Sequence, residues 1–86
     1  MITSAQMRAG RAMVRWSAEE LAARAKIGVA TVRRAEITEG SPTITEANAE
    51  AIRTALENAG VEFIAENGGG AGVRLKKSAK VERSEP

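Results

Sequence analysis

The sequence predicts a small, mainly α-helical protein of four to five helices, followed by a short two-stranded β extension. Seventeen of the 86 residues are alanine, which favours helix but buries little apolar area. Apolar residues recur at helical spacing as far as Gly60, and then "VEFI" and "GVRL" alternate as strands do. We expect a helical domain over residues 1–60, the β extension over 61–76 and a disordered tail over 77–86.

The first helix is expected to begin at Thr3 or Ser4, both good N-cap residues, and to run to about Val14. Met7 and Gly10 fall on its inner face. A glycine inside a helix costs roughly 1 kcal/mol relative to alanine. Gly10 is therefore expected to admit a neighbouring helix closely.

The second helix is predicted from Ala18 to Ala25, because "SAEE" fits a capping box with Ser17 at the N-cap and Glu20 three residues later. The residues expected to point inward are Leu21, Ala22 and Ala25. A third helix follows from about Gly28 to Ala35. The small core is expected to contain Trp16, Leu21 and Val32.

The break between these two helices spans Lys26 to Val29. It requires either a left-handed conformation at Lys26 or a bend at Gly28. "EGSP", residues 39–42, is a second breaker. A fourth helix is predicted to begin near Thr43 or Thr45 and to stop at Gly60, a glycine just past the helix end. Its expected inward residues are Ala47, Ala51, Ile52, Ala55 and Leu56.

The net charge of +2 hides a segregation along the chain. Residues 1–34 carry seven basic side chains against two glutamates, residues 35–68 carry seven glutamates against one arginine, and residues 69–86 are basic again. A basic N-terminal segment followed by an acidic one is typical of a protein that binds nucleic acid on one surface and exposes the opposite surface to solvent. Ordinary scatter of charge over helix surfaces is the alternative.

The composition argues against catalysis. There is no cysteine and no histidine, so disulfides, thiol nucleophiles and the usual zinc sites are absent, and we expect neither a metal nor a cofactor. The glycines of "NGGGAG" lack the continuation of a phosphate-binding loop. Without a long apolar run or a signal peptide, we expect a cytoplasmic, non-enzymatic protein that does not enter membranes.

The segment "WSAEELAARAKIGVATVRRAE", Trp16 to Glu36, followed by "GSP", resembles the helix-turn-helix family of phage lambda repressor and Cro, also called XRE-like. That family typically shows W-S-Q-E-E-L-A, a turn, S-x-x-T-I, a basic residue and E-x-G-x-x-x-P. The resemblance runs from about Gln6 to Leu56, and "AGVEFIAENGGGAGVRLKK" is similar to a β extension of some small bacterial members. It implies a bundle whose third helix enters the DNA major groove.

By position, the resemblance implies that DNA bases are contacted by Val29, Ala30, Arg33 and Arg34. Arg33 is the candidate for a bidentate contact to guanine O6 and N7, whereas Arg34 either reads a base or only covers the helix surface. Val29 or Ala30 would touch a thymine methyl. The implied phosphate contacts are Ser17, Arg24, Lys26 and Thr31.

Arg11 and Glu36 match a family ion pair that ties the first helix to the end of the third, so we expect a structural role for both. Three positions depart from the family pattern. Ala18 occupies the position where the family commonly has glutamine, and Lys26 the position where the turn usually has glycine. The third helix opens with Gly28 and two apolar residues. These departures predict weaker or less discriminating DNA binding by each subunit.

The residues predicted to form a dimer interface are Val61, Phe63, Ile64, Val73 and Leu75. A poor core and an isolated two-stranded ribbon both favour self-association. We therefore expect a homodimeric transcriptional regulator of bacterial or phage origin, most naturally a repressor, on a two-fold operator with half-sites roughly 34 Å apart. The alternative is a protein-binding adaptor on the same fold, such as an antitoxin or antiactivator, whose β extension joins a partner's sheet.

Overall fold

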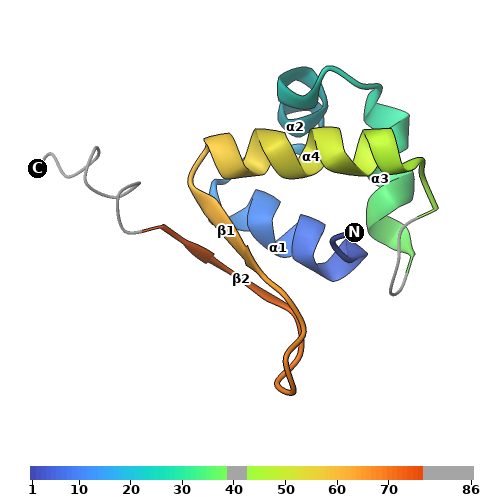
Figure 1. Ribbon diagram of the computed structural model, residues 1–86. Coiled ribbons are helices and arrows are strands. Elements are labelled where there is room, and N and C mark those ends of the chain that lie inside the picture. Colours follow the sequence, from blue (N-terminus) through green and yellow to red (C-terminus); the bar gives the residue numbers. More distant parts are fainter. Residues whose placement is uncertain (39–42, 77–86) are drawn as a thin grey trace, which may run out of the picture.

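The computed structural model describes residues 1–38 and 43–76, which form four α-helices and then a two-stranded antiparallel hairpin (Figure 1). The elements are α1 (Ser4–Met13), α2 (Ala18–Ala25), α3 (Val29–Ile37), α4 (Glu46–Asn58), β1 (Val61–Ile64) and β2 (Gly72–Leu75). The mainly α class with a C-terminal hairpin is confirmed. None of the helices in the described ranges is long and apolar enough to cross a membrane. The predicted breaker at 39–42 and the predicted tail at 77–86 lie outside the described residues.

A capping box formed by Thr3 and Gln6 fixes the start of α1. The hydroxyl of Thr3 accepts from the amide of Gln6 (3.1 Å), and the Gln6 side-chain oxygen accepts from the amide of Thr3 (2.9 Å). The side-chain nitrogen of Gln6, Nε2, also donates to the carbonyl oxygens of Ile64 (3.2 Å) and Gly72 (2.9 Å), which are paired across the hairpin. Gln6 therefore both caps α1 and ties the hairpin to it.

Helix α2 starts at the predicted cap and ends at a strained residue. The hydroxyl of Ser17 accepts from the amide of Glu20 (3.0 Å), as expected, but the reciprocal half of the predicted capping box is wrong because the Glu20 side chain bonds Arg24 instead. The helix ends at Lys26, which is left-handed (φ 61°, ψ 43°). Gly28 keeps an ordinary φ of −74° as N-cap of α3, so the turn bends at Lys26.

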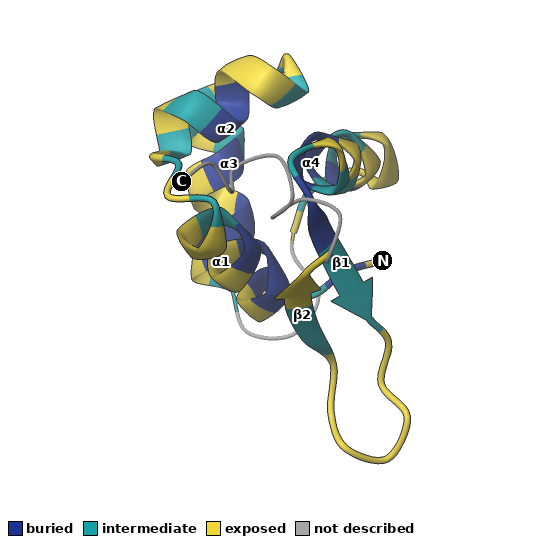
Figure 2. Ribbon diagram, turned by 90° about the vertical axis from the view of Figure 1, so that its left-hand side faces the viewer, coloured by how far each residue is buried: buried dark blue, intermediate teal, exposed yellow. Residues whose placement is uncertain are grey.

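The core lies where the four helices meet one another and the inner face of the hairpin (Figure 2). Leu21 and Val32 are fully buried as predicted, but Trp16 is half-buried at the edge of the core. Two inward residues predicted for α4 are also wrong, because Ala47 is exposed and Ala51 half-buried. The buried residues of α4 are Ala49, Ile52, Ala55 and Leu56. Alanines on several sides of this helix left its inner face ambiguous in the sequence.

The hairpin packs its apolar face on its own helices. Cross-strand partners Val61 with Leu75 and Phe63 with Val73 share one face, and Val61 is fully buried. A Cβ on Gly10 would lie 3.4 Å from Val61 and 3.3 Å from a methyl of Leu56 on α4, which confirms the predicted close approach. The chain between the strands, residues 65–71, extends away from the helices (Figure 1). The hairpin and the helices therefore share one core.

Candidate nucleic-acid interface

One side of α3 is buried and the other is open to solvent. Val32 and Ala35 are fully buried, and at about 3.6 residues per turn the opposite side carries Ala30, Arg34 and Ile37. Ile37 is 78% exposed. We call Ala30, Arg33, Arg34 and Ile37 the exposed face of α3. Ile37 was not among the predicted contact residues, although its position one turn beyond Arg33 and Arg34 could have suggested it.

Arg33 does not stand alone on this face. Its Nη2 donates to Oε2 of Glu19, so the pair joins α3 to the first turn of α2. Both side chains remain largely in solvent, with 55% of the Arg33 side chain and 63% of the Glu19 side chain exposed. Hydrogen bonds from its own backbone amide and from Arg33 lower the pKa of Glu19. The arginine predicted to read a base is thus paired with a carboxylate.

Arg34 is exposed and lies apart from that ion pair. Within residues 1–38 and 43–76 its side chain makes no ion pair and no hydrogen bond to another side chain. It borders a shallow groove of about 430 Å³ whose other walls are Thr43, Ile44, Thr45 and Asn48. Among the described residues, the two adjacent arginines therefore have different surroundings.

Arg24, a predicted phosphate contact, already has two partners. Its Nε donates to Glu20 one turn earlier in α2 (2.7 Å), and its guanidinium lies over the ring of Trp16, 4.7 Å from the ring centre. The half-buried indole therefore packs against both the Arg24 guanidinium and the core. Arg24 would have to give up the bond to Glu20 to use the same nitrogen on a phosphate.

The other predicted contacts differ in how accessible they are. Ser17, Lys26 and Ala30 are exposed, and Ser17 keeps its capping bond. Val29 and Thr31 are half-buried, and the Val29 side chain packs against the core. The structure therefore brings the α2 start, the turn and the exposed face of α3 together, with Val29 turned partly inward.

The predicted pair of Arg11 and Glu36 is present and fixes the far end of α3. Two bonds join the guanidinium to the carboxylate, Nε to Oε2 at 2.9 Å and Nη2 to Oε1 at 2.8 Å, and Glu36 is only 7% exposed. The hydrogen bond to Glu36 raises the pKa of Arg11. Arg11 Nη1 also donates to the carbonyl of Trp16 (3.0 Å). Arg8 and Ser4, whose roles the sequence did not reveal, donate to backbone carbonyls at the same end of α3.

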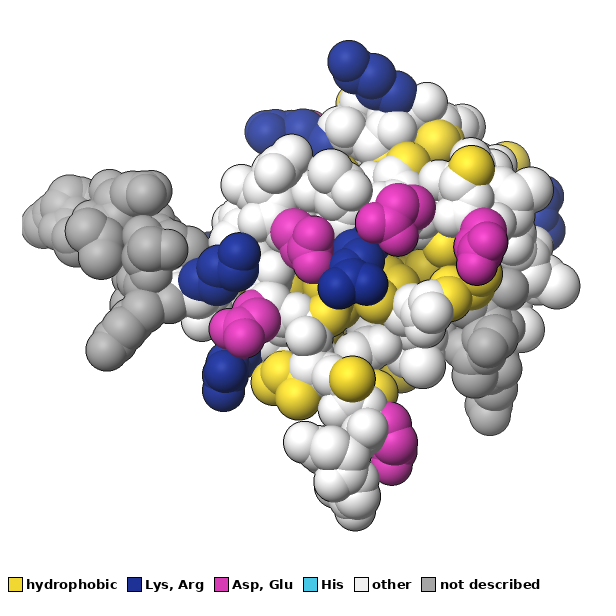
Figure 3. Space-filling view, viewed as in Figure 1, with side chains coloured by type: hydrophobic (Ala, Val, Ile, Leu, Met, Phe, Trp, Pro, Cys, Tyr) yellow, Lys and Arg dark blue, Asp and Glu magenta, His cyan; other side chains and the backbone are white. Residues whose placement is uncertain are grey.

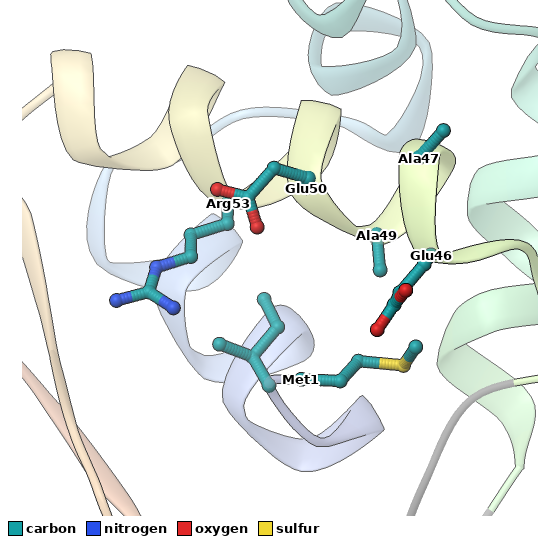
Figure 4. A pocket seen from close by; sticks show the side chains of 7 residues that line it. Met1, Glu46, Ala47, Ala49, Glu50 and Arg53 are labelled. Carbon is teal, nitrogen blue, oxygen red and sulfur yellow. The ribbon is translucent and has the colours of Figure 1, made fainter.

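The surface of α4 differs in charge from α2 and α3. Figure 3 shows acidic side chains around basic ones on the face that α4 fronts, with apolar surface between them. A hollow of about 330 Å³ lies on this surface, between the N-terminal residues and α4 (Figure 4). Its lining residues are Met1, Ile2, Glu46, Ala47, Ala49, Glu50 and Arg53. None of them belongs to α2 or α3, so the hollow is separate from the candidate interface.

No protein-family model and no curated protein sequence matches the chain. Among residues 1–38 and 43–76 no acidic cluster of three or more residues has the arrangement of a metal site.

Proposed function

We propose that the protein binds double-stranded DNA in a sequence-specific manner and regulates transcription, acting as a repressor. The observation that carries the proposal is α3 itself. Arg11 and Glu36 hold its inner side to α1, while its outer side presents Arg33 and Arg34 beside the short Ala30. A helix fits the DNA major groove, a short side chain permits close approach, and arginine is the commonest partner of guanine there.

The distribution of charge supports this orientation. The residues on and between α2 and α3 that extend into solvent include Arg24, Lys26, Arg33 and Arg34. Acidic side chains gather over α4 on the surface of Figure 3, and of these only Glu50 shares a shallow groove with one of the four, Arg24, among the described residues. The basic side chains of α2 and α3 attract phosphates, whereas the acidic side chains of α4 repel them. DNA would therefore approach α3 and leave α4 in solvent.

We further propose that the protein acts as a homodimer, but the five residues predicted for the interface need revision. Val61, Phe63 and Val73 pack on the chain's own core, so their side chains are not the free apolar face that was expected. Leu75 is 38% exposed at the open end of the hairpin, which we call its rim. Half-buried Ile64 lies on the face of the hairpin opposite Val61 and Phe63. A dimer contact through the hairpin would therefore use its rim and outer face.

Leu75→Glu tests the dimer better than removal of the hairpin, because truncation after Gly60 also deletes the buried Val61. Sedimentation should show a shift toward monomer in the variant. Ala71→Glu, an equal charge in the exposed connection between the strands, serves as the matched control. A dimer that is equally stable in both variants would exclude the hairpin rim from the interface.

DNA enriched from random sequence by the purified protein tests the main proposal, with affinities measured by fluorescence anisotropy. We expect a palindromic site bound at least about a thousandfold tighter than random DNA. Arg33→Ala should weaken the specific site most, whereas Lys26→Ala should weaken all DNA similarly and reduce the salt dependence. The absence of any enriched site would refute the proposal and favour the protein-binding adaptor.

A further inference from the structure

The ion pair of Glu19 and Arg33 is exposed and joins two helices, unlike the exposed ion pairs within α2 and α4. Two other pairs, Arg24 with Glu20 and Arg53 with Glu57, lie one turn apart in a single helix. Glu19 and Arg33 instead bridge α2 and α3 on the surface proposed to meet DNA. An exposed ion pair contributes only about 0–1 kcal/mol to stability, so the fold has little need of it.

Glu19 is also a negative charge in an unfavourable place for a DNA-binding surface. It lies in the first turn of α2, where free backbone amides otherwise favour a phosphate. A carboxylate there repels phosphates and reduces affinity for every DNA sequence. The same carboxylate is favourable at the start of a helix, and it also pairs with Arg33 of α3.

We infer that Glu19 is a positioning residue that increases DNA sequence specificity by holding Arg33 toward the major groove and balancing its charge. This inference rests on the proposed function. An unpaired arginine on α3 would attract any phosphate and strengthen binding to random DNA. Paired with Glu19, it contributes little net charge, so it gains most where a base supplies specific acceptors.

The hydrogen bonding of the pair leaves this contact open. The bond to Glu19 uses Nη2 of Arg33, and a guanidinium has five N–H donors in a fixed plane. The remaining donors are enough for the O6 and N7 acceptors of guanine. Glu19 can therefore stay bonded while Arg33 binds the base, which fixes the plane of the guanidinium and lowers the conformational entropy lost on binding.

Glu19→Gln tests the inference, with Glu20→Gln as the matched control. Both substitutions remove one carboxylate from the first turn of α2, but Glu20 pairs with Arg24 rather than Arg33. Affinities are measured on the enriched site, on the same site with 7-deazaguanine in place of the contacted guanine, and on random DNA at two salt concentrations. Thermal unfolding checks that both variants remain folded.

In Glu19→Gln we expect tighter binding to random DNA, with the log–log salt slope steeper by up to about 0.9, and a specificity ratio lowered about tenfold. Glu20→Gln should change specific and random affinities by similar factors. Loss of the guanine N7 should weaken the wild-type protein about tenfold and Glu19→Gln by less.

A specificity ratio in Glu19→Gln equal to that of Glu20→Gln would overturn the inference and leave the proposed function intact. A wild-type protein with no preference for any DNA sequence would overturn both. The two failures are therefore distinguishable in one set of titrations.

Discussion

Loss of the Arg11 side chain is predicted to destabilise this small fold strongly. Glu36 is 7% exposed and receives two hydrogen bonds from Arg11, at 2.8 and 2.9 Å. Arg11→Met preserves most of the side-chain volume but leaves that carboxylate buried without its partner. Removal of one member of a buried ion pair costs about 3–5 kcal/mol. A domain of this length has a total unfolding free energy of roughly 4–13 kcal/mol, so the variant should lose about a quarter of its stability or more.

Urea denaturation followed by circular dichroism measures this loss directly, and thermal unfolding should show a midpoint lower by more than about 10 °C. The double variant Arg11→Met/Glu36→Leu is the control, because replacing both partners with apolar groups is often nearly neutral. It should recover most of the lost free energy. A single variant within about 1 kcal/mol of the parent, or a double variant as unstable as the single one, would refute the reasoning.

Three other substitutions test separate features. Gln6→Leu removes both side-chain bonds to the hairpin, so it should cost about 1–3 kcal/mol and speed amide exchange in the strands; unchanged exchange would mean that the strands dock without Gln6. Lys26→Gly should raise the free energy of unfolding by up to about 1 kcal/mol, because Lys26 has a φ of 61° that glycine adopts without strain. Lys26→Ala keeps a Cβ and should give no such gain. Equal free energies of unfolding for the two variants would exclude strain at this turn. Arg74 lowers the pKa of Glu62 through its hydrogen bond, so the stabilising contribution of the pair is present above the ordinary carboxyl pKa and is lost as the pH falls through the lowered one. In Arg74→Gln, carboxyl NMR should show the pKa of Glu62 returning toward its ordinary value, and an unchanged titration would contradict this cause.

Short-range patterns predicted the helices and the turn well. Ser17 caps α2 and Gly60 follows α4 with a positive φ, as residues within a few positions of each helix end indicate. The strained turn at Lys26 was one of two alternatives that the sequence left open. The capping box of Thr3 and Gln6 carries a recognisable T-x-x-Q signal, so it could have been predicted too.

Contacts between distant segments could not be predicted in this way. The alanines of α4 are apolar on several sides, and only packing against the other helices selected Ala49 rather than Ala47. The hairpin offered apolar residues for a partner, but its own helices cover Val61 first because that contact costs no association entropy.

The sequence by itself determined the helix positions to within a few residues, the charge segregation and the residue types on α3, since these depend on neighbours along the chain; the end of α3 lies at Ile37, two residues beyond the predicted Ala35. Tertiary structure alone decided that Glu19 meets Arg33, because they lie fourteen positions apart in the sequence and the contact depends on how α2 crosses α3. It also decided that Gln6 holds the hairpin, a contact that spans most of the chain. Local interactions fix where each helix starts and ends, while the fitting together of buried side chains fixes which surfaces face each other.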